Sequence, residues 1–303
     1  LVTLGSAART NVDNIQIIQT AQAAGSINTQ NIDSSVTTFN ITNTADAALT
    51  SAATTVTGGA GSFTANLGAS VAGQTLGVMG HALTVTDTGS ATTDAVTINN
   101  LAVDSTAGQN LDVFNGQSIT STGYENVTIN SGAATNATGN QDINVLTITA
   151  DSASAGASLT LTGTNGVDIT SLVTNSTGLL TVDASALTAQ ATGTYSLTIA
   201  GTTSGTAGTQ SITGSAGEDS IVVGAFASTI SGGAMNDTIT GGTAADSIDG
   251  GTGNDSLTGS GGNDTIRGGD GGDTIVATVA GTVSIDGGAG NDTIDIGATL
   301  ATG

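Results

Sequence analysis

The chain has 303 residues, with 46 glycines, no proline, no cysteine and a formal net charge of −22. The absence of cysteine excludes disulfides and thiolate metal sites. Two arginines without any lysine cannot supply the clustered bases that nucleic acids and anionic membranes require. We therefore expect cations as partners, with no nucleic acid and no membrane insertion.

The first 80 residues give weak structural signals. We expect this segment to be rich in strands, with strand-like runs at 36–43 and 54–57 and a short helix over 12–24. No function is assigned to it from the sequence.

Residues 81–204 alternate apolar side chains with threonine, which is typical of β-strands. The runs lie at 83–88, 95–99, 125–130, 145–149, 159–163, 179–185 and 195–200. Their irregular spacing favours an irregular parallel β-solenoid, with a β-sandwich as the alternative.

Residues 205–296 repeat every nine residues, and a tail follows at 297–303. Glycine is the most frequent residue at the first, the second and the fourth position, aspartate at the sixth, and the eighth is apolar. The aspartate-bearing copies begin at 214, 232, 241, 250, 259, 268 and 287. Copies from 205 and 223 keep the frame but place Gln210 and Ser228 at the sixth position, and 277–286 interrupts it.

This pattern suits calcium chemically. Glycine permits positive φ angles that turn carbonyl oxygens into the loop, and the aspartate adds a carboxylate. Such oxygens suit Ca²⁺, which accepts 6–8 of them at about 2.3–2.6 Å. We expect several Ca²⁺ ions as the cofactor. The candidate ligands are Asp219, Asp237, Asp246, Asp255, Asp264, Asp273 and Asp292, with the loop glycines Gly214, Gly217, Gly232, Gly241, Gly250, Gly253, Gly259, Gly268, Gly287 and Gly290.

Nine residues should form half a coil, so sixth positions eighteen residues apart should stack. One edge then carries Asp219, Asp237, Asp255, Asp273 and, if the interruption serves as a half-coil, Asp292. The other edge carries Gln210, Ser228, Asp246 and Asp264. This predicts as many as four full sites on the first edge and one on the second, with half-sites at the ends.

The array is expected to fold only when calcium is bound. Two carboxylates about 4.8 Å apart repel by about 3.5 kcal/mol at an effective dielectric near 20. A core of one apolar side chain per half-coil cannot offset this repulsion plus an ordering entropy of about 1–2 kcal/mol per residue. Met235 and Ala244 replace the fourth-position glycine and should weaken the loops of Asp237 and Asp246.

The nonapeptide array resembles the RTX β-roll of Gram-negative proteins exported by type I secretion. The Thr- and Ala-rich strands upstream, including 179–188, resemble the body of surface-layer (S-layer) proteins such as that of Caulobacter. The resemblance implies an all-β fold in which a C-terminal RTX β-roll stacks on an irregular right-handed β-helix-like body.

The same resemblance implies a secreted, extracellular protein of the cell surface. It would fold on calcium after secretion and assemble with other copies of itself into a surface layer, with cell-surface polysaccharide as a second candidate partner. Because the family's uncleaved export signal lies beyond the array, we expect further sequence after residue 303.

We expect no enzymatic activity from the motifs present. His81 is the only histidine, which excludes a His-Glu-x-x-His zinc site, and without lysine neither a Walker loop nor a Schiff base can form. The alternative reading is a fragment of an RTX adhesin, or the non-catalytic C-terminal region of a secreted RTX enzyme.

Four upstream aspartates close or follow the strand runs: Asp87, Asp104, Asp151 and Asp183. They either cap turns by bonding to the backbone two residues on, which we favour, or bind calcium at the rim of the solenoid. Asp249, Asp270, Asp286 and Asp295 lie off the sixth position and are expected to face solvent, with Arg267 offsetting neighbouring acids.

Overall fold

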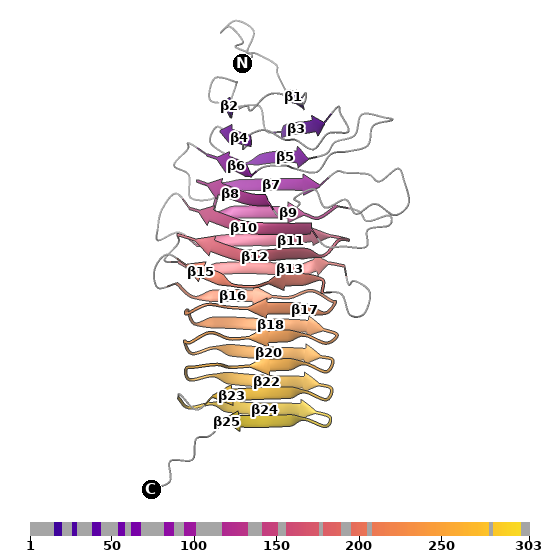
Figure 1. Cartoon of the computed structure of the whole chain (residues 1–303), viewed down its shortest axis with the longest axis vertical. Helices are drawn as coiled ribbons and strands as arrows, with labels where there is room; N and C mark the ends of the chain where they lie inside the picture. Colours follow the sequence, from indigo (N-terminus) through magenta and orange to yellow (C-terminus); the bar gives the residue numbers. More distant parts are fainter. Residues whose placement is uncertain are drawn as a thin grey trace, which may run out of the picture.

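The computed structural model describes residues 15–19, 26–28, 38–43, 54–57, 62–67, 82–87, 94–100, 117–132, 141–150, 156–175, 178–188, 195–204, 208–278 and 281–297. Within these ranges the chain is all-β, which confirms the expected fold class. The chain runs alternately through two parallel sheets, and the strands of each sheet stack along one long axis (Figure 1). No helix of the described ranges is long and apolar enough to cross a membrane.

The first sheet, sheet A, follows the odd-numbered strands through the body and the even-numbered strands through the array. In hydrogen-bonded order it contains β1 (Ile15–Gln19), β3 (Thr38–Asn43), β5 (Phe63–Leu67), β7 (Ala95–Asn100), β9 (Asn126–Asn130), β11 (Ala157–Gly163), β13 (Leu180–Leu187), β16 (Gln210–Thr213), β18 (Ser228–Ala234), β20 (Ser247–Thr252), β22 (Thr265–Asp270) and β24 (Ser284–Ala289).

The second sheet, sheet B, takes the intervening strands. It contains β2 (Ser26–Asn28), β4 (Thr54–Thr57), β6 (Leu83–Thr86), β8 (Gln117–Thr122), β10 (Gln141–Thr149), β12 (Val167–Thr174), β14 (Leu197–Ile199), β17 (Asp219–Val222), β19 (Thr238–Thr240), β21 (Ser256–Thr258), β23 (Thr274–Thr278) and β25 (Thr293–Gly297), with β15 (Thr202–Ser204) beside β12.

Alternation along each strand decides which side chains fill the core. In β9, Val127 and Ile129 are buried while Thr128 faces outward, and β-branched residues of this kind favour strands. In the array one side chain per half-coil enters the core. Those buried at this position are Ile212, Ile221, Ile230, Ile239, Ile248, Leu257, Ile266 and Ile275.

Coil length distinguishes the body from the array. In the body Ala95 pairs with Asn126 and Ala157 with Leu180, so successive coils differ in length. From β16 to β23 the register steps by eighteen residues, as in Ile212 to Ile230, and the last step, to β24 and β25, is nineteen residues. Irregular coils therefore give way to regular ones within one continuous pair of sheets.

The sheets continue without a break across residues 200–210. Strand β13 pairs with β16, and β14 pairs with β17, both in parallel. The array is therefore stacked directly on the body, and its first coil extends hydrogen-bonded edges that the body provides.

Two expectations from the sequence are wrong. The helix proposed over 12–24 is contradicted by β1, where Ile15, Ile17 and Ile18 extend to pair with β3, as β-branched residues favour. The β-sandwich alternative for the body is contradicted by its parallel pairings, because sandwiches are built from antiparallel sheets.

Candidate metal sites

The nonapeptide turns line two edges of the solenoid. Turns from sheet A to sheet B form the first edge, and turns from sheet B to sheet A form the second. Asp219 begins β17 after a turn on the first edge, whereas Asp246 directly precedes β20 after a turn on the second. The nine-residue spacing thus sends successive copies to opposite edges, as the sequence predicted.

Hydrogen bonds join the sixth positions into a column on the first edge. The backbone N–H of Asp219 donates to Oδ1 of Asp237 at 2.8 Å, and Asp237 N–H donates in the same way to Asp255 at 2.8 Å. The column continues from Asp255 to Asp273 at 2.8 Å and from Asp273 to Asp292 at 3.0 Å. All five carboxylates predicted for this edge are therefore stacked on it.

The ten-residue interruption serves as one half-coil. Thr265 pairs with Ser284 and Thr274 with Thr293, a step of nineteen residues, and both sheets continue through it. Asp292 therefore keeps its place below Asp273.

The second edge carries a shorter column. Ser228 N–H donates to Oδ1 of Asp246 at 2.8 Å, and Asp246 N–H donates to Asp264 at 3.0 Å. Higher on this edge Gln210 accepts a hydrogen bond from the Thr202 hydroxyl at 2.8 Å. Neutral hydrogen bonds thus replace the carboxylates where the array meets the body.

The second carboxylate oxygen is left unsatisfied in four of these aspartates. Oδ2 of Asp237, Asp255, Asp264 and Asp273 is buried and has no hydrogen-bond donor. An unpaired buried carboxylate oxygen is costly, so it calls for a cation.

Three of these carboxylates, those of Asp237, Asp255 and Asp273, face a backbone carbonyl across a small space. An ideal Cβ added to Gly232 would lie within 3.0 Å of both Asp237 Oδ2 and the carbonyl oxygen of Gly250. The oxygens therefore surround a volume that only glycine leaves open. The same pair of oxygens surrounds Gly214, Gly250 and Gly268 on the first edge and Gly241 on the second, whereas Gly259 and Gly287 face their aspartate without a carbonyl from the next coil.

Within the described array these oxygen pairs number four on the first edge and one on the second. Binding of calcium at each individual residue stays a prediction. The donors are all oxygens, from carboxylates and carbonyls, and such a set fits Ca²⁺ better than a softer metal. No three His, Cys, Asp or Glu side chains of the described ranges cluster to hold a metal, so carbonyls are needed to complete each site.

Burial and mutual repulsion raise the proton affinity of the column. Burial, followed by the charge of Asp219, raises the pKa of Asp237 from 3.8 to about 8. Burial likewise raises the pKa of Asp219 and of Asp255 to about 6, and it raises the pKa of Asp246 and Asp264. Without a cation, Asp237 therefore keeps its proton near neutral pH, and the other four aspartates ionise less readily than a solvent-exposed aspartate.

The uppermost aspartate of the first edge differs from those below. Asp219 accepts hydrogen bonds at Oδ1 from Leu197 N–H at 2.9 Å and the Ser215 hydroxyl at 2.8 Å, and at Oδ2 from Ser215 N–H at 2.6 Å. Ser215 stands where other copies have glycine, and its hydroxyl also accepts from Gly217 N–H at 3.0 Å. The Asp219 carboxylate thus accepts more hydrogen bonds than the aspartates below it, even without a cation.

Glycine is required at the fourth position because of both φ and close approach. Gly253 has φ +137°, and a Cβ there would overlap the carbonyl oxygen of Met235 in the coil above. Met235 itself adopts φ 73°, a left-handed conformation that costs a residue with a Cβ roughly 1–3 kcal/mol. Ala244 has no positive φ, so of the two replacements of the fourth-position glycine only Met235 takes this conformation; Ser260, at a second position, takes it too, with φ 69°.

Asparagine side chains at the fifth position also join successive coils, a role that was not predicted from the sequence. The Oδ1 of Asn236 accepts from Asn254 N–H at 2.7 Å, and that of Asn254 accepts from Gly272 N–H at 2.6 Å. Asn263 accepts from Thr282 N–H at 2.8 Å on the other edge. The recurrence of asparagine before the aspartate was the available signal.

A family model for the RTX calcium-binding nonapeptide repeat matches residues 204–225, 213–248, 222–257, 240–275 and 276–298. Residues 204–298 are RTX calcium-binding repeats. The RTX array therefore binds several Ca²⁺ ions, and RTX proteins are typically secreted and extracellular. No curated protein and no solved structure matched the chain.

The other charged residues singled out in the sequence lie off the sixth positions or outside the described ranges. Asp183 Oδ1 accepts from Ser185 N–H at 3.0 Å, the expected bond to the backbone two residues on, but Asp183 lies within strand β13 and not in a turn. Arg267 pairs with Asp249 at 3.5 Å on the exposed face of sheet A. Asp270, Asp286 and Asp295 are exposed, whereas His81, Asp104 and Asp151 fall outside the described residues.

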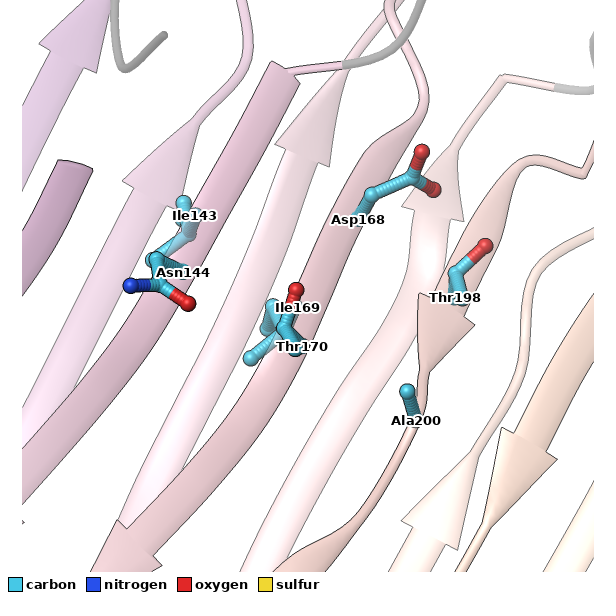
Figure 2. A pocket seen from close by; sticks show the side chains of 7 residues that line it. All are labelled: Ile143, Asn144, Asp168, Ile169, Thr170, Thr198 and Ala200. Carbon is cyan, nitrogen blue, oxygen red and sulfur yellow. The ribbon is translucent and has the colours of Figure 1, made fainter. Parts of the chain in front are cut away.

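A groove of about 420 Å³ lies on the outer face of sheet B, across β10, β12 and β14 (Figure 2). It is lined by Ile143, Asn144, Asp168, Ile169, Thr170, Thr198 and Ala200. Its one carboxylate is surrounded by hydroxyl and amide groups, which suit hydrogen bonding to a polar surface more than acid–base chemistry.

Proposed function

We propose that this chain is a structural, non-enzymatic protein of a bacterial surface layer, in which calcium completes folding outside the cell and copies of the chain assemble together. The proposal is carried by one observation: the RTX array continues both sheets of the body without a break. Calcium bound along its edges would therefore extend one stiff rod, which suits a building block with fixed dimensions.

The electrostatics of the array support folding after export. Its two columns contain seven sixth-position aspartates, and among the described residues the one base beside the array strands, Arg267, pairs with Asp249 on an outer face. In a compartment poor in calcium the stacked carboxylates within each column repel one another, whereas calcium outside the cell neutralises them. The chain would thus stay open until it is secreted.

The outer faces supply surfaces for self-assembly. Threonines occupy matching register positions on sheet A, where Thr64 pairs with Thr97 and Thr97 with Thr128. A similar row joins Thr84, Thr120 and Thr147 on sheet B. Rows of hydroxyls can donate and accept hydrogen bonds along another copy or a cell-surface polysaccharide.

Negative-stain imaging of the purified chain with calcium and with chelator tests the proposal. Ordered sheets should form in calcium only, and a variant with Asp237 and Asp255 both changed to alanine should form none. If the wild-type chain remains monomeric by sedimentation at high concentration in millimolar calcium, the surface-layer proposal is wrong and an adhesin or enzyme fragment is favoured.

A further inference from the structure

A second group of buried acids lies far from the RTX array, on the part of the second edge that belongs to the body. The turn between β8 and β9, residues 123–125, lies beside the two ends of the loop that joins β6 to β7. Asp87 N–H donates to the Thr122 carbonyl at 2.7 Å, and Asn126 N–H donates to the Asp94 carbonyl at 3.1 Å. Asp87 is thus placed beside Gly123 and Asp94 beside Glu125, with Tyr124 between them.

Two of these side chains, Asp87 and Tyr124, are buried without the hydrogen-bond partners that burial demands. Asp87 is 5% exposed and Tyr124 is 0% exposed. Neither carboxylate oxygen of Asp87 nor the Tyr124 hydroxyl has a hydrogen-bond partner. Asp94 and Glu125, at 5% and 4% exposed, add two more acids to the same turn region.

Asp87 therefore departs from the capping role favoured from the sequence. Asp183, by contrast, lies within β13 and accepts from both the backbone and the hydroxyl of Ser185. An unpaired carboxylate in a dry site costs several kcal/mol unless an opposite charge is supplied. Retaining Asp87 in this position requires such a charge.

Among the described residues, no basic side chain is available to supply this charge. The chain has two bases apart from its single histidine, and Arg267 lies at the opposite end of the solenoid, paired with Asp249 (Figure 1). Burial, followed by the nearby charges of Asp87 and Asp94, raises the pKa of Tyr124 far above its usual range. The hydroxyl is thus neutral, with both acids near it.

We propose that Asp87 and Asp94, on either side of Tyr124, bind a calcium ion outside the RTX repeats. The donors are hard oxygens, which favour Ca²⁺ over a softer metal. Since no three acidic side chains of the described ranges gather closely enough to bind one ion alone, backbone carbonyls and water complete the shell. The ion ties the β6–β7 loop ends to the β8–β9 turn and so braces the body.

The two tyrosines of the chain allow a direct test with terbium, a luminescent substitute for calcium. The chain contains no tryptophan, so ultraviolet excitation reaches bound Tb³⁺ through Tyr124 or Tyr195. Tyr124 lies in the proposed site, whereas Tyr195 lies two residues before Leu197, which bonds to Asp219 of the array. Tyr124→Phe should abolish one component of calcium-displaceable emission that Tyr195→Phe leaves intact.

Calcium counting on the full chain completes the test. Asp87→Asn should bind one ion fewer than wild type by native mass spectrometry, whereas Asp183→Asn, which alters a hydrogen-bonded carboxylate, should bind the full number. Asp255→Ala should leave the Tyr124-sensitised emission in place, which separates this site from the array. Circular dichroism of each variant establishes that it is folded.

Thermal melts distinguish a cation from protons held by the acids. With calcium bound, Asp87→Asn should melt below wild type, and in chelator it should melt above, because a buried charge has been removed. If Asp87→Asn keeps the full calcium count, or if Tyr124→Phe leaves the terbium emission unchanged, the proposal is wrong.

Discussion

The backbone N–H of Asp237 donates a 2.8 Å hydrogen bond to Oδ1 of Asp255, the sixth-position residue of the next coil on the same edge. Oδ2 of Asp255 faces the space beside Gly250. Each interior aspartate thus performs two tasks, since one oxygen holds the coil above and the other is available to calcium. Removing it should affect both folding and binding.

Asp255→Ala should weaken calcium-induced folding more than Asp246→Ala. Asp255 stands between two carboxylate neighbours in the first column, whereas Asp246 has one, Asp264, and its Oδ2 already accepts from Gly242 N–H at 2.8 Å. Loss of a charged hydrogen bond costs about 1.5–3 kcal/mol, so the calcium midpoint of Asp255→Ala should rise at least about tenfold. Calcium titration of the full chain by far-UV circular dichroism measures both midpoints, and equal shifts would contradict the edge assignment.

Acid should partly replace calcium. The pKa of Asp237 is raised from 3.8 to about 8 and that of Asp255 to about 6, by burial first in both cases. A raised folded-state pKa means that the folded form binds more protons than the unfolded form, so stability is gained as pH falls from about 8 toward 3.8 and is lost as pH rises through this range. In chelator, β-structure should increase on acidification. In calcium, protons should compete with the ion, so the calcium midpoint should rise as pH falls over the same range.

Met235→Gly should stabilise the calcium-bound array. Met235 holds φ 73°, a conformation that glycine adopts freely, although glycine loses roughly 0.5–1 kcal/mol more on ordering. The expected gain is about 1 kcal/mol, seen as a higher melting temperature in saturating calcium. Ala244→Gly is the matched control at the same repeat position. Because Ala244 has no positive φ, its replacement should give no gain.

The regular part of the chain was predictable because its sequence period equals its structural period. Asp219, Asp237 and Asp255 recur every eighteen residues, and a residue pattern with a fixed period specifies stacking directly. Threonine alternation likewise located β7 and β9. Strands β8 and β12 were missed because QSITST and VDITSLVT place serine or aspartate among their apolar residues, which blurs the alternation.

Side-chain roles in the body were less predictable because they depend on coils of unequal length. Asp87 and Asp183 follow similar strand runs, and nothing in the local sequence separates the unpartnered carboxylate of Asp87 from the hydrogen-bonded one of Asp183. The difference arises from the coil that lies beneath each residue. Only the register of β6 on β8 brings Asp87 to the turn that contains Tyr124.

Gly253→Ala should prevent the array from stacking normally, whereas Gly261→Ala should be tolerated. A Cβ on Gly253 would overlap the Met235 carbonyl oxygen, and its φ of +137° is strained for alanine, so the cost should exceed about 2 kcal/mol. A Cβ on Gly261 would meet its nearest atom, the Thr243 Cα, at 3.8 Å, an ordinary contact. Melting in saturating calcium should show a large fall for Gly253→Ala and little change for Gly261→Ala. Similar falls in both would mean that general chain stiffness, and not the close approach of successive coils, explains why the repeat requires glycine.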